Sequence, residues 1–196
     1  MGIFPWSDSP ITWWSPDPRA VFDIGTFAPS KRLAQKMRSG GFSITFDKAF
    51  DEVIQACAAP APGREETWIS PYFIEAYQRF HREGHAHSTE VWLGNKLVGG
   101  LYGVTLGGFF AGESMFHLVS DASKIALTAT IHRLRQLGFV LFDTQAATPA
   151  TLTMGAIEIS REDYLNKLRS ALMLVPPPFP INNVPEGGIE PPTKGL

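Results

Sequence analysis

The sequence predicts an α+β protein in which helices pack on the faces of one mixed α/β sheet. Three strand-like stretches follow one another between residues 86 and 118, and the last two contain glycines. Helical patterns flank them at 70–84 and 120–138, and an apolar run at 139–145 indicates a further buried strand. With 196 residues, the chain is long enough for one sizeable core and a small second lobe.

The remaining elements follow from local signals, taken in chain order. Proline and tryptophan clusters in residues 1–29 predict irregular chain rather than long helix or strand. A basic helix is expected at 30–40, because Gly40 and Gly41 end it, and a strand at 42–46. Residues 47–58 begin with an aspartate cap and carry apolar residues on one helical face.

In the second half of the chain, the residues that begin and end helices are easier to identify. Ser70 caps the helix at 70–84, Pro71 takes its first position, and Gly84 ends it. The strands are expected at 86–93, 96–106 and 108–118, and a last helix at 160–174. Seven of the prolines follow residue 175, and the tail they occupy is expected to be extended or disordered.

Composition excludes several classes of protein. Hydrophobic residues make up 44% and charged residues 18% of the chain, an ordinary globular balance. A net charge of −2 argues against a broadly basic nucleic-acid binder, so any such contact requires a local patch. The single cysteine, Cys57, excludes an intrachain disulfide and favours a reducing compartment. Without a signal peptide or a long apolar run, a cytoplasmic protein without membrane contact is expected.

Familiar catalytic motifs are incomplete. No glycine-rich stretch continues into the Gly-Lys-Ser/Thr of a phosphate loop. The histidines of "HREGHAH" do not fit a zinc helix, because Gly84 interrupts it, so satisfied or surface histidines are expected and no metal. Ser114 in "GESMF" lacks the second glycine of a nucleophile elbow, and no histidine follows Asp143 to complete a triad.

Three polar features remain as candidates. Glu113, between glycine and aromatic residues in "GGFFAGESMF", is either a solvated turn acid or a polar anchor in an apolar pocket. Asp143 and Gln145 lie two apart at a strand end, so they face the same side, as a functional pair or a strand-end cap. Four cations without an acid among them form either a phosphate patch or a solvated helix face. They are Lys31, Arg32, Lys36 and Arg38.

Eight motifs occur in a fixed order: "GIFPW", "WWSPDPR", "TWI", "AYQRFHREGHAHSTEVW", "LVGGLYGV", "GESMFH", "ASK" and "FDTQ". Together, over residues 2–175, they resemble the leucyl/phenylalanyl-tRNA–protein transferases. The resemblance implies a small N-terminal lobe at 1–62, an acetyltransferase-like (GNAT-type) catalytic domain at 63–175, and a tail at 176–196. It implies transfer of Leu or Phe, and in some members Met, from aminoacyl-tRNA to proteins with N-terminal Arg or Lys. Such proteins are thereby tagged for N-end-rule degradation. A monomer that needs no cofactor is expected.

The resemblance also implies roles for particular residues. Asp143 and Gln145 become the catalytic pair, in which Asp143 orients or polarises and Gln145 engages the attacking amine. Glu113 becomes the acidic residue at the edge of the substrate site. Trp6 and Trp68 match tryptophans that contact the terminal adenosine, although core packing is the alternative for both. The four cations become the grip on the tRNA backbone. The apolar donor pocket would be lined by Leu101, Phe110, Gly112, Leu127, Leu134 and Phe142.

The chain departs from the family pattern in three places, one of which is the Pro/Gly-rich tail after residue 180, which has no counterpart in the family. The chain also begins just before "GIFPW", without the upstream Gly-Gly-Asp-Leu stretch, so the expected N-terminal lobe is truncated. Ala150 stands near the place where the family commonly carries a histidine. Two alternatives to the transferase therefore stay open. One is another acyltransferase with the GNAT fold, and the other is an inactive protein that binds tRNA or degrons.

Overall fold

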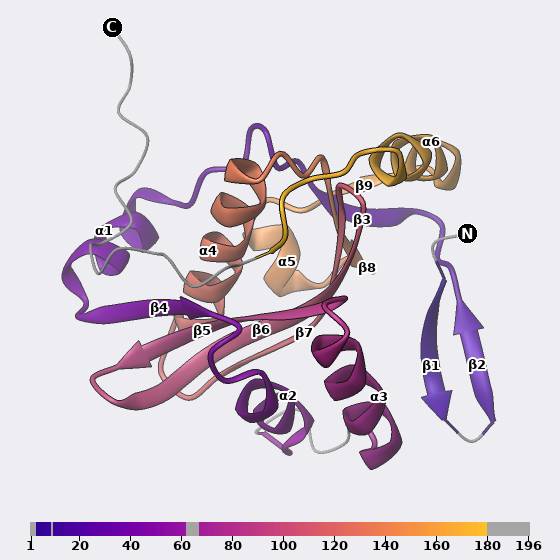
Figure 1. Cartoon of the computed structure of the whole chain (residues 1–196). Coiled ribbons are helices and arrows are strands. Elements are labelled where there is room, and N and C mark those ends of the chain that lie inside the picture. Colours follow the sequence, from indigo (N-terminus) through magenta and orange to yellow (C-terminus); the bar gives the residue numbers. More distant parts are fainter. Residues whose placement is uncertain (1–2, 9, 62–66, 180–196) are drawn as a thin grey trace, which may run out of the picture.

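The computed structural model describes residues 3–8, 10–61 and 67–179, with the backbone alone for residues 6–8. A seven-stranded mixed sheet runs through its centre in the order β4-β5-β6-β7-β8-β3-β9 (Figure 1). The strands are β3 (Arg19–Phe22), β4 (Phe42–Phe46), β5 (Ala86–Leu93), β6 (Lys96–Leu106), β7 (Phe109–His117), β8 (Leu141–Gln145) and β9 (Ile157–Ile159). The predicted α+β class with a mixed sheet is confirmed.

Neighbouring strands are antiparallel except for β7 and β8, which are parallel. Residues 109–111 of β7 pair with residues 141–143 of β8, and no later residue of either strand continues that ladder. The two strands therefore part where Glu113 and Gln145 follow the paired segment. Where a strand no longer pairs with its neighbour, its peptide groups and side chains become available to a ligand.

Six helices accompany the sheet: α1 (Lys31–Ser39), α2 (Phe50–Ala58), α3 (Pro71–Arg82), α4 (Ala122–Gln136), α5 (Pro149–Thr153) and α6 (Arg161–Leu172). Helices α1 and α4 lie on one face of the sheet, and α2 and α3 lie on the other (Figure 1). Helix α6 packs beside β7 and β8 through Tyr164, Leu168 and Ala171.

Two apolar clusters divide the core between the sheet faces. The α4 face holds the larger one, which includes Phe110, Leu127 and Phe142. The opposite face holds a second cluster around α2 and α3. Close approach of α4 to the sheet depends on Gly99, since a side chain there would meet the Ala122 Cβ at 2.6 Å.

The predicted elements after residue 30 are confirmed, with ends shifted by at most three residues. The predicted aspartate cap of the helix at 47–58 is wrong: α2 begins at Phe50 after Ala49, because the Asp47 carboxylate accepts from the Ser88 N–H and contacts His87 instead. The prediction of irregular chain for residues 1–29 is wrong, because this stretch contains three strands. β1 (Phe4–Asp8) and β2 (Ile11–Trp14) form a hairpin, and β3 is buried between β8 and β9. These strands are four or five residues long and are separated by segments that contain prolines, so their formation depends on strand partners rather than local propensity. The short α5 and β9 also escaped prediction.

Two segments bear on the predicted domain boundaries. β3 and β4, which precede residue 62, pair with β8, β9 and β5 in the large sheet. Among the described strands, the β1–β2 hairpin stands apart from that sheet. At the start of the predicted tail, Phe179 is buried and stacks on Phe110 with ring centroids 5.9 Å apart. The rest of the tail, residues 180–196, lies outside the described residues.

No helix among the described residues has both the length and the apolar character needed to cross a membrane.

Candidate active site

A buried ion pair lies where β3 meets β8. Arg19 Nε donates to Asp143 Oδ1 at 2.9 Å, and one terminal nitrogen of Arg19 donates to Asp143 Oδ2 at 2.7 Å. The two side chains are 2% and 0% exposed, so each charge depends on the other. Two parallel bonds between a guanidinium and a carboxylate also fix the orientation of both groups. Arg19 is therefore a member of the site that sequence reasoning missed.

Two further donors complete the surroundings of Asp143. The Tyr164 hydroxyl from α6 donates to Oδ2 at 2.9 Å. The backbone N–H of Gln145 donates to Oδ1 at 2.8 Å. Gln145 adopts a φ of 67°, a left-handed conformation that glutamine rarely takes, so the Asp143 bond holds the strand end in a specific turn. Burial and the neighbouring Asp143 charge raise the pKa of Tyr164, which keeps its hydroxyl protonated as a donor.

Glu113 on β7 faces this turn. Gln145 Nε2 donates to Glu113 Oε2 at 3.2 Å, and Tyr77 on α3 lines the same cavity as this carboxyl group. Burial raises the pKa of Glu113 to about 7, although Gln145 and the Tyr77 hydroxyl oppose that rise. Glu113 is thus a polar anchor beside apolar walls, which is one of the two alternatives that the sequence left open.

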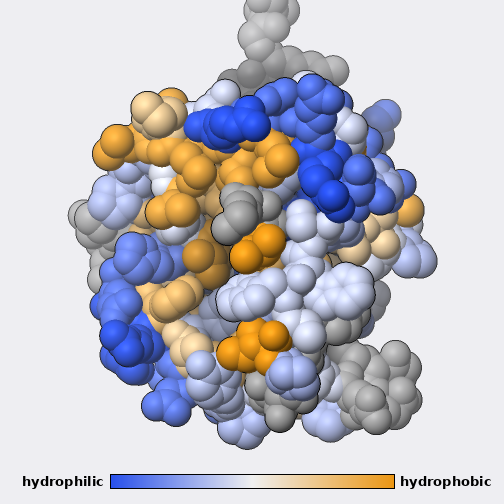
Figure 2. Space-filling view, turned by 90° about the vertical axis from the view of Figure 1, so that its right-hand side faces the viewer, coloured by the Kyte–Doolittle hydropathy of each residue, from blue (hydrophilic) through white to orange (hydrophobic). Residues whose placement is uncertain are grey.

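These polar groups form the floor of a cavity of about 620 Å³. Its walls come from the β1–β2 hairpin, α3, α6 and strands β6 and β7. Several apolar wall residues are more than 40% exposed: Ile11, Trp13, Tyr72, Phe80 and Leu106. Figure 2 views the hairpin side and shows hydrophobic surface gathered between hydrophilic areas. An apolar cavity with a few converging polar groups is the usual form of a substrate site.

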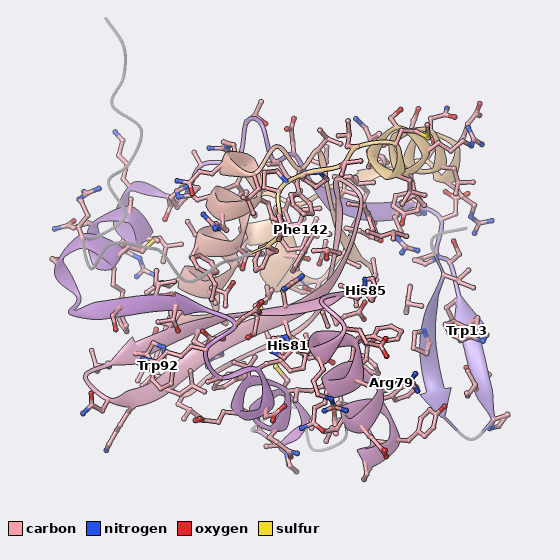
Figure 3. The ribbon with its side chains drawn as sticks, in the orientation of Figure 1. Trp13, Arg79, His81, His85, Trp92 and Phe142 are labelled. Carbon is pink, nitrogen blue, oxygen red and sulfur yellow. The ribbon has the colours of Figure 1, made fainter. Side chains whose placement is uncertain are left out.

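The predicted donor-pocket residues lie elsewhere. Leu101, Phe110, Leu127, Leu134 and Phe142 are almost fully buried in the cluster beneath α4, on the opposite side of the sheet from the cavity walls. Figure 3 shows Phe142 beside α4, far from Trp13 on the hairpin. At the sixth position, Gly112, an added Cβ would meet the Phe142 ring at 2.7 Å. The six residues do come together, and their role as a donor pocket stays a prediction.

The two predicted adenosine contacts have different outcomes. Trp6 belongs to β1, but its side chain lies outside the described part of the structure. Trp68 is half-buried and packs edge-on against Phe73 and Tyr77, with ring centroids 5.5 Å and 6.3 Å apart. Those contacts are the core packing given above as its alternative role, and stacking on a base stays a prediction.

The four predicted tRNA-binding cations lie on α1, beside the start of α4. Lys36 Nζ contacts Asp121 Oδ2 at 2.9 Å and donates to the Ser120 carbonyl at 2.8 Å, so this lysine ties α1 to α4. Arg32 is 83% exposed and lies 3.8 Å from the same aspartate. Lys31 and Arg38 are exposed as well. Three of the four cations therefore face solvent and are accessible to phosphates.

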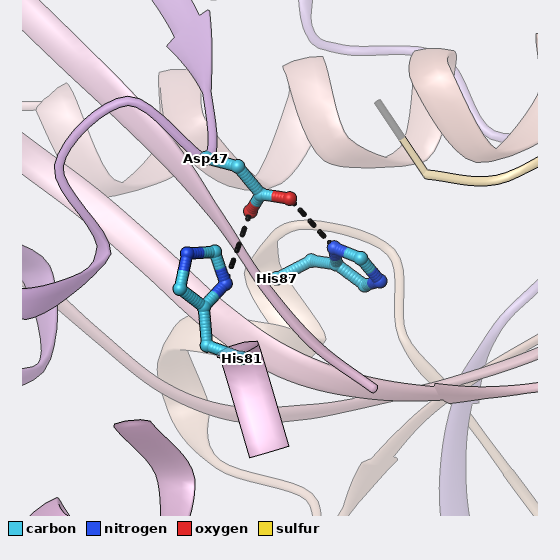
Figure 4. Close-up of side chains that lie close together, drawn as sticks. All are labelled: Asp47, His81 and His87. Atoms are coloured by element: carbon cyan, nitrogen blue, oxygen red, sulfur yellow. Dashed lines mark hydrogen bonds and ion pairs between the residues drawn. The ribbon is translucent and has the colours of Figure 1, made fainter. Parts of the chain in front are cut away.

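Two of the three histidines of "HREGHAH", His81 and His87, contact protein acceptors. His87 Nδ1 lies 2.7 Å from Asp47 Oδ2, and His81 Nδ1 lies 2.8 Å from the Ala86 carbonyl oxygen and 3.9 Å from Asp47 Oδ1 (Figure 4). Because a carbonyl oxygen accepts and never donates, His81 Nδ1 carries a proton and offers no lone pair to a metal. The expectation of satisfied histidines is confirmed for His81 and His87.

The mixed sheet, the parting strands and the carboxylate–amide floor of an apolar cavity together have the form of an enzyme site. A family model described as leucyl/phenylalanyl-tRNA protein transferase matches residues 21–169. Relatives named leucyl/phenylalanyl-tRNA–protein transferase share 46–48% identity with the chain. They come from Syntrophotalea carbinolica (48%; 87% of this chain, 76% of the relative), Solidesulfovibrio magneticus (48%; 87% and 70%) and Shewanella piezotolerans (46%; 86% and 72%). The protein is thus an aminoacyltransferase. It belongs to the leucyl/phenylalanyl-tRNA protein transferase family.

Solved structures with a similar chain trace have low sequence identity. One is L-PGS from Bacillus licheniformis, with a TM-score of 0.48 and 11% identity over 80% of this chain and 57% of that chain. Another is the C-terminal domain (DUF2156) of a putative lysylphosphatidylglycerol synthetase from Agrobacterium fabrum. It has a TM-score of 0.48 and 12% identity over 84% of this chain and 54% of that one.

Proposed function

We propose that this chain transfers Leu or Phe, with Met as a further donor, from aminoacyl-tRNA to the N-terminal Arg or Lys of acceptor proteins. The product carries a new peptide bond and is tagged for N-end-rule degradation. One observation carries the proposal: Gln145 is held at the floor of an apolar cavity by its backbone N–H on Asp143 and by its side-chain amide on Glu113. A group held in this way can orient an attacking amine toward a neighbouring ester.

The chemistry needs few catalytic groups. The donor is an ester, which is already activated, and the acceptor is an amine. Attack of the amine nitrogen on the ester carbon forms the amide bond, and the 3′-oxygen of the tRNA ribose leaves. No covalent enzyme nucleophile is required, since positioning and proton transfer account for the acceleration. This agrees with the incomplete nucleophile motifs of the sequence.

The acceptor is expected to enter the cavity, because its aromatic walls suit a cationic N-terminal side chain. The donor side chain is assigned to the apolar cluster beneath α4, which contains Phe110 and Leu127. Phe110→Ala is therefore expected to weaken discrimination among Leu, Phe and Met donors. A variant that loses stability but keeps the donor preference would contradict this assignment.

The tRNA grip is assigned to the exposed cations of α1. Neutralising Lys31, Arg32 and Arg38 together is expected to weaken tRNA binding and to flatten its dependence on salt, because each phosphate contact contributes to the salt slope. Lys36 stays unchanged in this variant, since its bond to Asp121 holds α1 in place. An unchanged salt slope would make α1 an ordinary solvated helix.

Finer points belong to the same proposal. We assign the GNAT-type fold to the large sheet and its helices, with the β1–β2 hairpin as part of a small N-terminal lobe. Trp6 and Trp68 are assigned to the terminal adenosine, where stacking contributes roughly 1–3 kcal/mol per base. The enzyme is expected to act in the cytoplasm as a monomer, where its tRNA and protein substrates occur.

Transfer of radiolabelled leucine tests the function directly. Leucyl-tRNA is supplied with a peptide that begins with arginine, and a peptide that begins with alanine serves as the matched control. Label on the arginine peptide alone would support the proposal. Binding of leucyl-tRNA without product would identify an inactive binding protein, and absence of both would favour another acyltransferase.

A further inference from the structure

The Asp143 carboxylate has no free position for a substrate proton. A carboxylate offers about four lone-pair sites. Oδ1 receives Arg19 Nε and the Gln145 N–H, and Oδ2 receives the second Arg19 nitrogen and the Tyr164 hydroxyl. The side chain is also 0% exposed. Taking a proton from a substrate would break one of these bonds beside a buried guanidinium, so Asp143 acts as a positioning residue.

Glu113 has the opposite situation. Among the described residues that line the cavity, Asp143 and Glu113 are the carboxylates, and Glu113 is half-buried with access to the cavity. Gln145 Nε2 donates to one Glu113 oxygen at 3.2 Å, and a carboxylate with about four lone-pair sites still has acceptor positions for a ligand. Gln145 itself cannot serve as a base, because a carboxamide does not take up a proton near neutral pH.

From this geometry we propose that Glu113, rather than Asp143, takes the proton that the acceptor's α-ammonium group must lose before its nitrogen attacks. The inference rests on the proposed function and assigns one role within it. Gln145 contacts both carboxyl groups: its backbone N–H donates to Asp143, and its side-chain amide donates to Glu113. The group that receives the proton and the group that fixes the turn are therefore linked through one residue.

The charged and titratable groups around Glu113 come from five elements. Tyr77 faces it from α3, Tyr102 from β6, Asp143 from β8, Arg19 from β3 and Tyr164 from α6. Burial is the largest influence and raises the pKa of Glu113 to about 7, while Arg19 lowers this pKa and Asp143 raises it. A proton acceptor is most effective when its pKa lies near the working pH.

In the proposed step, one proton of the α-ammonium group goes to Glu113 and a second leaves with the ribose oxygen. The α-ammonium nitrogen gives one proton to a Glu113 carboxylate oxygen, and its freed electron pair forms the C–N bond to the ester carbon. The C–O bond to the ribose 3′-oxygen then breaks, and that oxygen leaves with the second proton from the nitrogen as a hydroxyl group. Glu113 finally releases its proton to water, so no oxidant, metal or further reactant is needed.

The test compares wild type with Glu113→Gln in transfer of leucine to the arginine peptide between pH 6 and pH 9.5. Removal of a general base is expected to lower kcat/KM about 100-fold or more near pH 6.5. The variant then depends on the small fraction of acceptor that is already neutral, and an α-amino group has a pKa of about 8. The deficit is therefore expected to shrink to about tenfold or less at pH 9. Glu113→Asp, which keeps a carboxylate, is expected to show the same dependence of kcat/KM on pH as wild type, with a lower kcat/KM at each pH.

Two controls separate the outcomes. Gln145→Ala removes a positioning group and is expected to lower activity equally at every pH. Glu158→Gln changes an exposed carboxylate on β9 and is expected to match wild type. A Glu113→Gln deficit that stays constant with pH would overturn the proposal and leave Glu113 as a binding group. A wild-type chain that transfers no leucine at any pH would overturn the proposed function, and the role of Glu113 with it.

Discussion

Replacement of Arg19 by methionine tests how strongly the site depends on its buried ion pair. Methionine keeps much of the side-chain length but removes both bonds to Asp143, at 2.9 Å and 2.7 Å. The carboxylate then stays at 0% exposure without its counter-charge. Breaking one partner of a buried pair costs about 3–5 kcal/mol, because an uncompensated charge remains in the interior. The Arg19→Met variant is expected to lose this amount of unfolding free energy.

A double variant and a control variant test whether the stability loss comes from the unpaired Asp143 charge. The double variant Arg19→Met, Asp143→Leu leaves no buried charge, so it is expected to recover much of the lost stability. Arg79→Met serves as a matched control. Arg79 is a solvent-exposed arginine that contacts Glu83 at 2.9 Å, and its loss is expected to change stability barely measurably.

Urea unfolding followed by circular dichroism measures all four proteins. With a slope of about 2 kcal/mol per molar urea, the Arg19→Met midpoint is expected to fall by about 1.5–2.5 M. A midpoint within about 0.5 M of wild type would refute the reasoning, because Asp143 would then not depend on Arg19 for its burial. A double variant less stable than the single one would refute it as well.

Three further changes probe other parts of the molecule. Gly112→Ala is expected to lower stability by about 1–3 kcal/mol in urea unfolding, because its Cβ would meet the Phe142 ring at 2.7 Å; an unchanged midpoint would contradict this packing. Phe179→Ala removes a buried ring stacked on Phe110, so a lower melting temperature and faster proteolysis of the C-terminal segment are expected, whereas equal cleavage rates would argue against the contact. In the folded protein the pKa of Glu113 is about 7, against an ordinary value of 4.5, so the folded state holds this proton more tightly than the unfolded state does. The free energy of unfolding of wild type is therefore expected to fall by about 2–3 kcal/mol as pH rises from about 4.5 to 7. Glu113→Gln should remove this dependence, and equal slopes in the two proteins would exclude the raised pKa.

The elements that the sequence predicted are those with long, regular patterns. The helix at 122–136 and the three strands between 86 and 117 have caps, glycine stops and apolar periodicity that act locally. β3 could not be found in this way. Its four residues follow a proline-rich stretch, and they become a strand because β8 and β9 supply hydrogen bonds on both sides. Tertiary pairing of this kind leaves little trace in local sequence.

Sequence patterns likewise predicted some residues of the candidate site and missed others. Asp143 and Gln145 were found because they end an apolar strand, and both line the cavity as their spacing predicts. Arg19 and Tyr164 were missed, since neither belongs to a catalytic motif and both residue types are common at protein surfaces. One signal for Arg19 was available: an arginine directly before the apolar run Ala20–Phe22 is pulled inside if that run forms a buried strand, and then requires an acidic partner. Glu113 could be assigned to an apolar environment only once the fold brought Tyr77 and Gln145 beside it.

The position of β3 has a consequence for the order in which the protein is made. Arg19 precedes Asp143 by 124 residues, and its strand lies between two strands that are synthesised much later. At about 5–20 residues per second, a ribosome needs about 6–25 s to reach the partner of Arg19. The ion pair of the site therefore cannot form until the chain has been made as far as Asp143. In the proposed function this delay has a use, because aminoacyl-tRNA is also the material of translation, and an unfinished enzyme cannot draw on the supply that is still building it.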